Sequence, residues 1–336
     1  MNITIVMAGY GEGGLEKHVV ELANGLMRHK NGIQVSVIAD PMYGARFAQG
    51  VTFMPFAFSS SRRNPIALFR LWRTMRRTRP DIVHAHGNKA ASMVGRLLPL
   101  LKVRSVATLH SRKKNVRMFH AFERVIAVSQ VSTVNVAHPA VRIVYNGVAL
   151  PDGHAMASDE AWHHAPRGKR VIAVGRLVPV KGFDLLIEAW RTIDASLLIL
   201  GEGFERPRLE QLIVSNGLSD RVRLAGHQCD VLPYMRSADL MVISSRYEGC
   251  PYVLIEALQH DLPVVSTRVG VMPELLPAQA LCDVEDPGSL AGTIKSALKD
   301  SGAFRAQFHA AFSHARTHLT LDSMIENTLS VYQELI

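Results

Sequence analysis

The chain has 336 residues, of which 48% are hydrophobic and 20% charged, a globular composition with room for two domains of about 150 residues each. No apolar run reaches the roughly 18 residues of a membrane span, and we expect no signal peptide, because the N-terminus starts directly with a strand pattern. Three cysteines without C-x-x-C spacing argue against a disulfide framework or a zinc site and fit a reducing cytosol.

Charge is unevenly distributed along the chain. Residues 1–150 contain 21 Lys and Arg against 6 Asp and Glu, a balance of +15, and the remaining 17 basic and 23 acidic residues give −6. This asymmetry predicts an anionic partner for the first half, such as a membrane face, a phosphorylated lipid or a nucleic acid. The alternative is two domains with unlike surfaces and no such partner.

The opening stretch MNITIVMAGYGEGGLEKHVV places Gly9, Gly11 and Gly14 in the pattern G-x-G-x-x-G after a predicted strand. Asp40, which closes the next predicted strand, lies near the ribose-reading position of a dinucleotide site. These residues permit an NAD site, but a strand, a glycine turn and a helix hold many other phosphates.

Short apolar runs alternate with helical stretches in both halves of the chain. The runs are ITIVMA, IQVSVIA, VTFMPF, DIVHAH, RSVATLH, RVIAVS and RIVYNGV, then RVIAVGR, SLLILGEG, RVRLAGH, DLMVISS and LPVVST; helical periodicity covers 14–29, 65–78 and 89–100. Residues 150–169 have no clear period and read as a linker. The alternation predicts an α/β protein with two Rossmann-like domains and parallel sheets.

Polar residues follow many of these strands, at the edge where open parallel sheets bind ligands. The first half supplies residues 9–14, His84, His86, His110, Ser129 and Asn146, and the second supplies Arg176, Gly201, Gly203, Gly226, His227 and residues 246–248. Because His84 and His86 alternate along one strand, we expect them to point in opposite directions, with one of them in the core.

Two basic segments stand out in the first half. The stretch SRRNPIALFRLWRTMRRTRP combines seven arginines with a helical apolar stripe, which we expect to pack on the sheet while the arginines attract anionic head groups. The stretch HSRKKNVRMFH adds Arg112, Lys113, Lys114 and Arg117 directly after His110, which favours an anionic acceptor.

Two stretches in the second half predict a nucleotide-sugar site. In GRLVPVKGFD, Arg176 and Lys181 share one loop at a strand end and suit a diphosphate. In SSRYEGCPYVLIEAL, Pro251 fits the first turn of a helix whose amides would bind an anion. Glu256 lies one turn further on, where its carboxylate can accept hydrogen bonds from vicinal hydroxyls, and Glu248 precedes the helix.

These elements resemble the family 4 retaining glycosyltransferases of the GT-B fold. Glu248 and Glu256 match the family's E-x7-E motif, GRLVPVKGFD matches G-R-L-x-x-x-K-G, and GGLEKHV matches the N-terminal glycine loop. PDIVHAHG, ATLHS, VYNGV and CDVLPYMRSADLMVISSRYEG follow in the family's order, so the resemblance spans nearly the whole chain.

The resemblance implies specific roles for these residues. Arg176 and Lys181 would bind the donor diphosphate, Glu256 the ribose, Glu248 and the backbone of Gly249, Cys250, Pro251 and Tyr252 the transferred sugar and phosphate, and the backbone of Gly226 and His227 the base. His110 would reach the donor sugar, and Gly13 and Gly14 would close over the diphosphate or the acceptor. His84, His86, Arg112 and Lys113 are candidate acceptor contacts. No metal site and no cofactor are expected, since the nucleotide-sugar is a co-substrate.

The resemblance also implies a domain plan and a function. An acceptor domain at 1–150, a linker at 151–168, a nucleotide-sugar domain at 169–317 and a helix at 318–336 crossing back to the first domain would place the two sheets across a central cleft. The implied activity is metal-independent, retaining hexosyl transfer from a nucleotide-sugar, with UDP as the expected nucleotide, to a cell-envelope glycan or lipid-linked acceptor such as lipopolysaccharide core. We expect a cytoplasmic protein on the inner face of the membrane, with no nucleic acid as partner.

One departure and several alternatives stay open. Val271 stands where the family usually has a second glycine, which puts that loop's ligand contact in doubt. The same fold could serve a nucleotide-sugar epimerase or phosphorylase, or an inactive scaffold. The basic half could instead bind nucleic acid, although aromatic residues make up only 7% of the chain and no recognition motif stands out.

Overall fold

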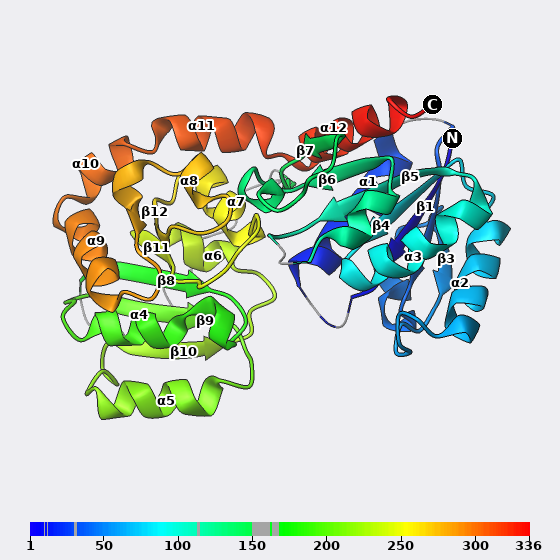
Figure 1. Cartoon of the computed structure of the whole chain (residues 1–336). Helices are drawn as coiled ribbons and strands as arrows, with labels where there is room; N and C mark the ends of the chain where they lie inside the picture. The colour runs from blue at the N-terminus through cyan, green and yellow to red at the C-terminus, as the bar shows by residue number, and fades with distance from the viewer. Residues whose placement is uncertain (10, 12, 30–31, 113–114, 150–161, 163–167) are drawn as a thin grey trace. The chain divides into compact units, whose positions relative to one another are not determined.

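The computed structural model describes all 336 residues except 10, 12, 30–31, 113–114, 150–161 and 163–167 (Figure 1). The chain divides into two compact units. The first unit combines Met1–Ala149 with Leu319–Ile336, and the second comprises Leu150–His318. Each unit is built on its own parallel sheet, which confirms the predicted α/β class.

The sheet of the first unit has, among the described residues, seven strands in the order β3-β2-β1-β4-β5-β6-β7, all paired in parallel. They are β1 (Asn2–Met7), β2 (Gln34–Ala39), β3 (Thr52–Pro55), β4 (Ile82–His86), β5 (Arg104–Leu109), β6 (Arg124–Ala127) and β7 (Val141–Ile143). Every residue of β4 is buried, as expected for a central strand covered by helices on both faces.

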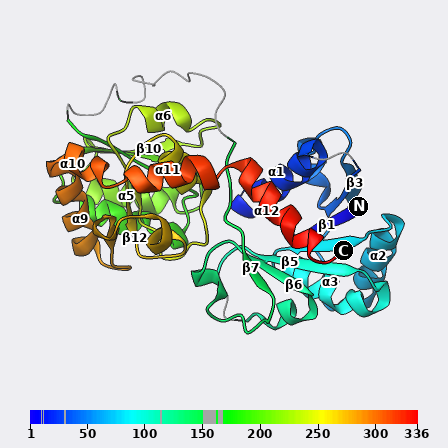
Figure 2. The ribbon, with the colours of Figure 1, turned by 90° about the horizontal axis from the view of Figure 1, so that it is seen from above.

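Two pairs of helices cover the two faces of this sheet. Helices α1 (Gly14–His29) and α12 (Leu321–Gln333) share one hydrophobic core with β1, and α2 (Pro65–Arg77) and α3 (Asn88–Leu101) share the other with β4. Figures 1 and 2 both show α12, in red, running beside α1. The two helices approach closely at Gly25, where a Cβ would collide with the side chain of Ile325. Short 3-10 turns η1 (Pro41–Arg46), η2 (Arg117–Ala121) and η3 (Val131–Thr133) complete the unit.

Helix α2 shows how the basic segment folds. The Asn64 side chain caps the helix by accepting hydrogen bonds from the amides of Ile66 and Ala67. Leu71 and Met75 are fully buried in the core, which confirms that the apolar stripe packs inward. No helix among the described residues is both long and apolar enough to cross a bilayer.

The sheet of the second unit has, in the described part of the chain, six strands in the order β10-β9-β8-β11-β12-β13. They are β8 (Arg170–Val174), β9 (Ser196–Leu200), β10 (Val222–Gly226), β11 (Leu240–Ile243), β12 (Val264–Thr267) and β13 (Leu281–Cys282). The helices are α4 (Phe183–Trp190), α5 (Arg206–Ser215), α6 (Leu232–Arg236), α7 (Tyr252–Gln259), α8 (Met272–Leu275), α9 (Pro287–Lys299), α10 (Ser301–Ala306) and α11 (His309–His318), with 3-10 turns η5 (Pro179–Lys181) and η6 (Ala278–Ala280).

Candidate functional site

Each sheet has one point where the order of its strands reverses. In the second unit β9 and β10 lie on one side of β8, and β11, β12 and β13 lie on the other. In the first unit the reversal falls between β1 and β4. Open α/β sheets bind their ligands at the carboxyl ends of the strands at such a point. The loops after β8 and β11, and those after β1 and β4, are therefore the places where functional residues are expected.

A partly buried ion pair joins the loops after β8 and β11. Lys181 Nζ lies 2.6 Å from Glu248 Oε1, and the same oxygen accepts a hydrogen bond from Ser245 Oγ at 2.7 Å. The side chains of Lys181 and Glu248 are only 20% and 11% exposed, so water screens the pair weakly. The stem of Lys181 lies beside Gly175, where the chain leaves β8. The structure thus brings together two residues predicted to contact the donor.

The backbone around Lys181 requires the glycine that follows it. Gly182 has a φ of 65° and ends the turn η5 before α4 begins. A Cβ at this position would collide with the carbonyl oxygen of Ser244. Ser244 Oγ in turn donates a hydrogen bond to the Lys181 carbonyl at 3.0 Å. The Lys-Gly pair in the sequence therefore reflects close packing of the two loops.

Arg246 braces the same two loops. Its guanidinium contacts Asp184 through both carboxylate oxygens, at 2.8 and 3.0 Å, and Glu285 at 2.6 Å. Its amide donates to the Val180 carbonyl at 2.8 Å. Burial alone would raise the pKa of Asp184, but the hydrogen bonds and charge of Arg246 outweigh it and lower that pKa. The sequence placed Arg246 at the strand edge but did not identify this brace, because its partners lie 62 and 39 residues away.

The Glu248 loop is held from behind by the Gly270–Val271 segment. Gly270 has a φ of 53°, and a Cβ there would collide with the Gly249 carbonyl oxygen. The amide of Val271 donates to that same carbonyl at 2.8 Å, and its side chain is fully buried. Valine in place of a second glycine therefore keeps the link between this segment and the Glu248 loop.

Helix α7 starts directly after the Glu248 loop, with Pro251 at its N-cap. The Leu254 amide is occupied by the Pro251 carbonyl at 3.2 Å, which leaves the first turn's other amides as the candidate anion donors. The side chains of Cys250 and Tyr252 are buried, so a ligand in solvent could reach only their backbone. Glu256 is half-buried, one turn into the helix.

The remaining candidate donor residues lie at the ends of β8 and β10. Arg176 and His227 are exposed, and Gly226 has a φ of 79°. Sequence reasoning missed the neighbouring pair Glu202 and Arg206, whose charged atoms are 2.6 Å apart and lie beside Gly226. Their spacing of four residues just after a strand was the available signal.

The glycine loop of the first unit packs around a carboxylate. Cβ atoms at Gly9 or Gly13 would collide with the Glu16 side chain, which is only 8% exposed. Tyr43 ties the loop down, since its hydroxyl donates to the Gly11 carbonyl at 2.9 Å. The glycines at positions 9 and 13 therefore make room for this side chain. Gly14 begins α1, and Asp40 caps the turn η1 through the amide of Met42.

Three histidines meet at the reversal point of the first unit. His18 comes from α1, His86 ends β4 and His110 follows β5, and their ring centroids are 5.3, 4.9 and 5.3 Å apart. His86 Nδ1 and His110 Nε2 are hydrogen-bonded at 3.1 Å. His18 Nδ1 lies 3.0 Å from Asn146 Oδ1, so this imidazole donates to the amide oxygen. His110 is half-buried, whereas His18 and His86 are buried.

The three histidines could hold a divalent metal ion. One nitrogen from each lies within 4.8 Å of the others, and within the described ranges no other His, Cys, Asp and Glu group has this geometry. Burial lowers the pKa of His18 to about 4 and the pKa of His86 well below its ordinary value. The rings of His18 and His86 are therefore neutral at pH 7, which is the form that binds metals. The sequence did not suggest this group, because its members lie 68 and 24 residues apart.

His84 corrects one expectation. Its ring lies 4.0 Å from that of His86, on the same face of β4, because side chains two residues apart on a strand point the same way. The prediction of opposite directions is wrong. His84 Nδ1 and Nε2 contact Tyr332 Oη at 2.6 Å and Thr108 Oγ1 at 2.7 Å, and the residue is fully buried. His84 therefore packs against His86 inside the first unit, and its side chain has no exposed surface for an acceptor to contact.

The other two acceptor candidates, Arg112 and Lys113, lie in the segment that follows His110. Arg112 is exposed, and Lys113 lies outside the described residues. Ser129, also at a strand end, is buried and bonded to Ser132 Oγ at 2.7 Å. Neither Arg112 nor Ser129 joins the histidine cluster.

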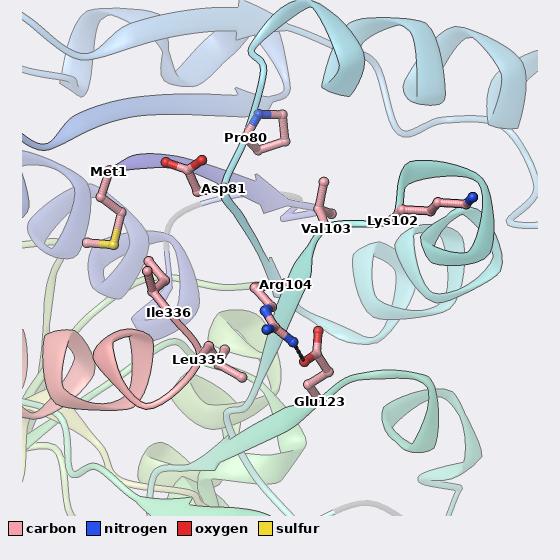
Figure 3. A pocket seen from close by; sticks show the side chains of 9 residues that line it. All are labelled: Met1, Pro80, Asp81, Lys102, Val103, Arg104, Glu123, Leu335 and Ile336. Atoms are coloured by element: carbon pink, nitrogen blue, oxygen red, sulfur yellow. Dashed lines mark hydrogen bonds and ion pairs between the residues drawn. The ribbon is translucent and has the colours of Figure 1, made fainter.

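A groove of about 920 Å³ lies at the opposite edge of the first sheet (Figure 3). Its walls include Asp81 before β4, Arg104 at the start of β5, Glu123 before β6 and the chain end at Ile336. Arg104 and Glu123 pair across it at 2.9 Å. Because this edge carries the amino ends of the strands, the groove is not the position at which such sheets bind substrates.

Comparison with known proteins identifies the family and the fold. Residues 12–150 match the model of Glycosyltransferase Family 4, and residues 168–300 match that of Glycosyl transferases group 1. Two curated relatives from Rhizobium meliloti (strain 1021) are the lipopolysaccharide core biosynthesis glycosyltransferases LpsE, 28% identical with 76% of each chain covered, and LpsD, 25% identical with 96% of this chain and 95% of LpsD covered. The crystal structure of Anabaena Alr3699/HepE in complex with UDP has a TM-score of 0.82, with 19% identity and full coverage of both chains, so it shares the fold.

Proposed function

The chain belongs to the family 4 glycosyltransferases of GT-B type, and from this premise we propose that it is a retaining enzyme using a UDP-sugar. The acceptor we propose is a cell-envelope glycan or lipid-linked glycan such as lipopolysaccharide core, in line with the names of LpsE and LpsD. The observation that carries the proposal is the Lys181–Glu248 pair at the reversal point of the second sheet, directly before the N-terminus of α7.

The second unit supplies the groups that a leaving diphosphate needs. Lys181 and the exposed Arg176 would offset the charge that develops when the glycosidic bond breaks, and the α7 amides would bind the same phosphates. Glu256 would accept hydrogen bonds from the ribose. With two cations in this role, the transfer would need no divalent metal.

Retention would proceed without a glycosyl–enzyme ester. Glu248 Oε1 is held by both Lys181 and Ser245, which suits a residue that binds sugar hydroxyls better than a nucleophile. A double displacement needs a carboxylate poised about 5 Å from its acid partner. Front-face attack, in which the departing diphosphate takes the acceptor proton, fits these residues, and His110 would orient the sugar.

The test measures donor binding and product stereochemistry together. Among UDP-, GDP- and ADP-sugars in a thermal-shift screen, we expect UDP-sugars to raise the melting temperature most. Transfer to a lipopolysaccharide core acceptor should give the donor's anomeric configuration by NMR and should continue in EDTA. An inverted product, or activity lost in EDTA and restored by Mg²⁺ or Mn²⁺, would overturn the mechanism.

Peripheral attachment to the inner face of the cell membrane is part of the proposal. On α2, Ile66 and Phe69 are 69% and 59% exposed, beside the exposed arginines 70, 73, 76 and 77. Apolar side chains flanked by arginines can insert among anionic head groups, each arginine adding about 1 kcal/mol.

We expect the double substitution Ile66→Ser and Phe69→Ser to reduce sedimentation with phosphatidylglycerol vesicles by about threefold or more. The matched control is Phe204→Ser with Val214→Ser, which removes from the second unit two apolar side chains that are at least as exposed. Equal bound fractions for the two double variants would remove α2 as the membrane contact.

A further inference from the structure

A second groove in the first unit, of about 750 Å³, is lined by arginines from three separate segments. Arg62 and Arg63 come from the connection between β3 and α2, Arg96 from α3, and Arg117 from the start of η2. These segments follow β3, β4 and β5. The groove therefore lies among the segments that cover one face of the first sheet, the face on which α2 and α3 pack.

The charge of this groove is not balanced by the protein. No acidic residue lines it, and within the described part of the chain no carboxylate pairs with the guanidinium groups of Arg62, Arg63, Arg96 or Arg117. By contrast, Arg206 and Arg246 of the second unit each contact two carboxylates. Four like charges around one groove repel each other unless an anion lies among them.

The floor of the groove is built from small residues that let two segments approach closely. A Cβ at Gly95 would lie 3.1 Å from the Ala121 Cβ, so α3 and η2 pack almost backbone to backbone. Ser92 is only 8% exposed and contributes to the same floor. Asn115 Oδ1 accepts a hydrogen bond from the Arg117 amide at 3.2 Å, which orders the start of η2. Arg96 and Arg117 thus project from α3 and η2, which pack closely together beneath the groove.

We propose that this groove binds phosphate groups of the acceptor. Planar guanidinium forks match phosphate oxygens in pairs, and four of them suit a pyrophosphate or two phosphomonoesters better than one carboxylate. The assignment rests on the proposed function, because it gives the anionic acceptor a defined anchoring point. Soluble glycans and lipid headgroups both carry such phosphates, and the two sources share this chemistry.

Arginine footprinting of the whole chain tests the proposal residue by residue. Phenylglyoxal modification is followed by mass spectrometry with and without inorganic tripolyphosphate. We expect Arg62, Arg96 and Arg117 to react at least several-fold more slowly when tripolyphosphate is present, and the exposed Arg28 of α1 and Arg104 of β5 to react unchanged. Phosphatidylglycerol vesicles form a second arm: protection by vesicles but not by tripolyphosphate would identify a lipid headgroup as the source.

Matched variants complete the test. Arg96→Gln with Arg117→Gln should abolish protection of Arg62, whereas Arg28→Gln with Arg104→Gln, with the same change of charge in the same unit, should not. Equal protection of all arginines, or no protection by either tripolyphosphate or vesicles, would show that the groove does not bind phosphate. Protection of Arg176 by UDP reports the donor site of the second unit separately, so failure of the groove and failure of the proposed function are distinguishable.

Discussion

Replacing Lys181 by Met should lower kcat by about a hundred- to a thousandfold, the range seen when one preorganised charge partner of a developing anion is removed. Lys181 is 20% exposed and fixed by Glu248 at 2.6 Å, so its ammonium is already in place when the diphosphate leaves. A steady-state assay with a UDP-sugar measures the effect. The matched control is Lys169→Met, which removes an exposed ion pair with Asp239 in the same unit and should leave kcat within about twofold.

The single substitution also leaves the Glu248 carboxylate without its cation, and a second variant separates this effect. Adding Glu248→Gln to Lys181→Met removes the uncompensated charge while Ser245 can still donate to the amide oxygen. If the lost cation is what matters, the double variant stays as slow as the single one. Recovery to near the wild-type rate would show that Lys181 serves only to neutralise Glu248.

The first unit should lose about 4 kcal/mol of stability between pH 7.5 and pH 5.5. His18, His84 and His86 are buried, and burial lowers the pKa of all three, that of His18 to about 4. The unfolded chain titrates near pH 6.5, so below that pH it binds protons that the folded unit excludes. The stability is complete above pH 6.5 and falls as the pH is lowered, by about 1.4 kcal/mol per histidine at pH 5.5.

Hydrogen exchange of β4 and β5 peptides in urea, with EDTA present, reports this unit without interference from the second. His18→Asn should reduce the loss by about one third, while His120→Asn, an exposed residue of the same unit, should not change it. A loss that is the same in wild type and in His18→Asn would mean that the buried histidines do not control the acid response.

The elements that the sequence predicted well are those decided by local pattern. Continuous apolar runs identified the strands of both sheets except the two-residue β13 (Leu281–Cys282), because a parallel strand buried on both faces has no polar side. Arg176, Lys181 and Glu248 could be placed at strand ends for the same reason. The roles assigned to them remain predictions.

The features that the sequence did not reveal depend on contacts between distant segments. Nothing near Glu16 in the chain shows that its carboxylate fills the space left by Gly9 and Gly13. The histidine cluster and the Arg246 brace bring together residues that are 24 to 92 positions apart. The His84 direction was different: the strand period of two already placed it beside His86.

The course of the chain has a consequence for how the protein is made. The core of the first unit is finished by α12, whose Tyr332 and Leu329 are buried against segments synthesised near the beginning. The second unit is one continuous stretch, so its core needs no residue from outside 150–318. Residues 1–149 cannot complete their core before residues 319–336 have been synthesised. Until then, the face of β1 and α1 that α12 covers stays exposed. A nascent chain stalled before residue 319 is therefore the species most exposed to chaperones and proteases.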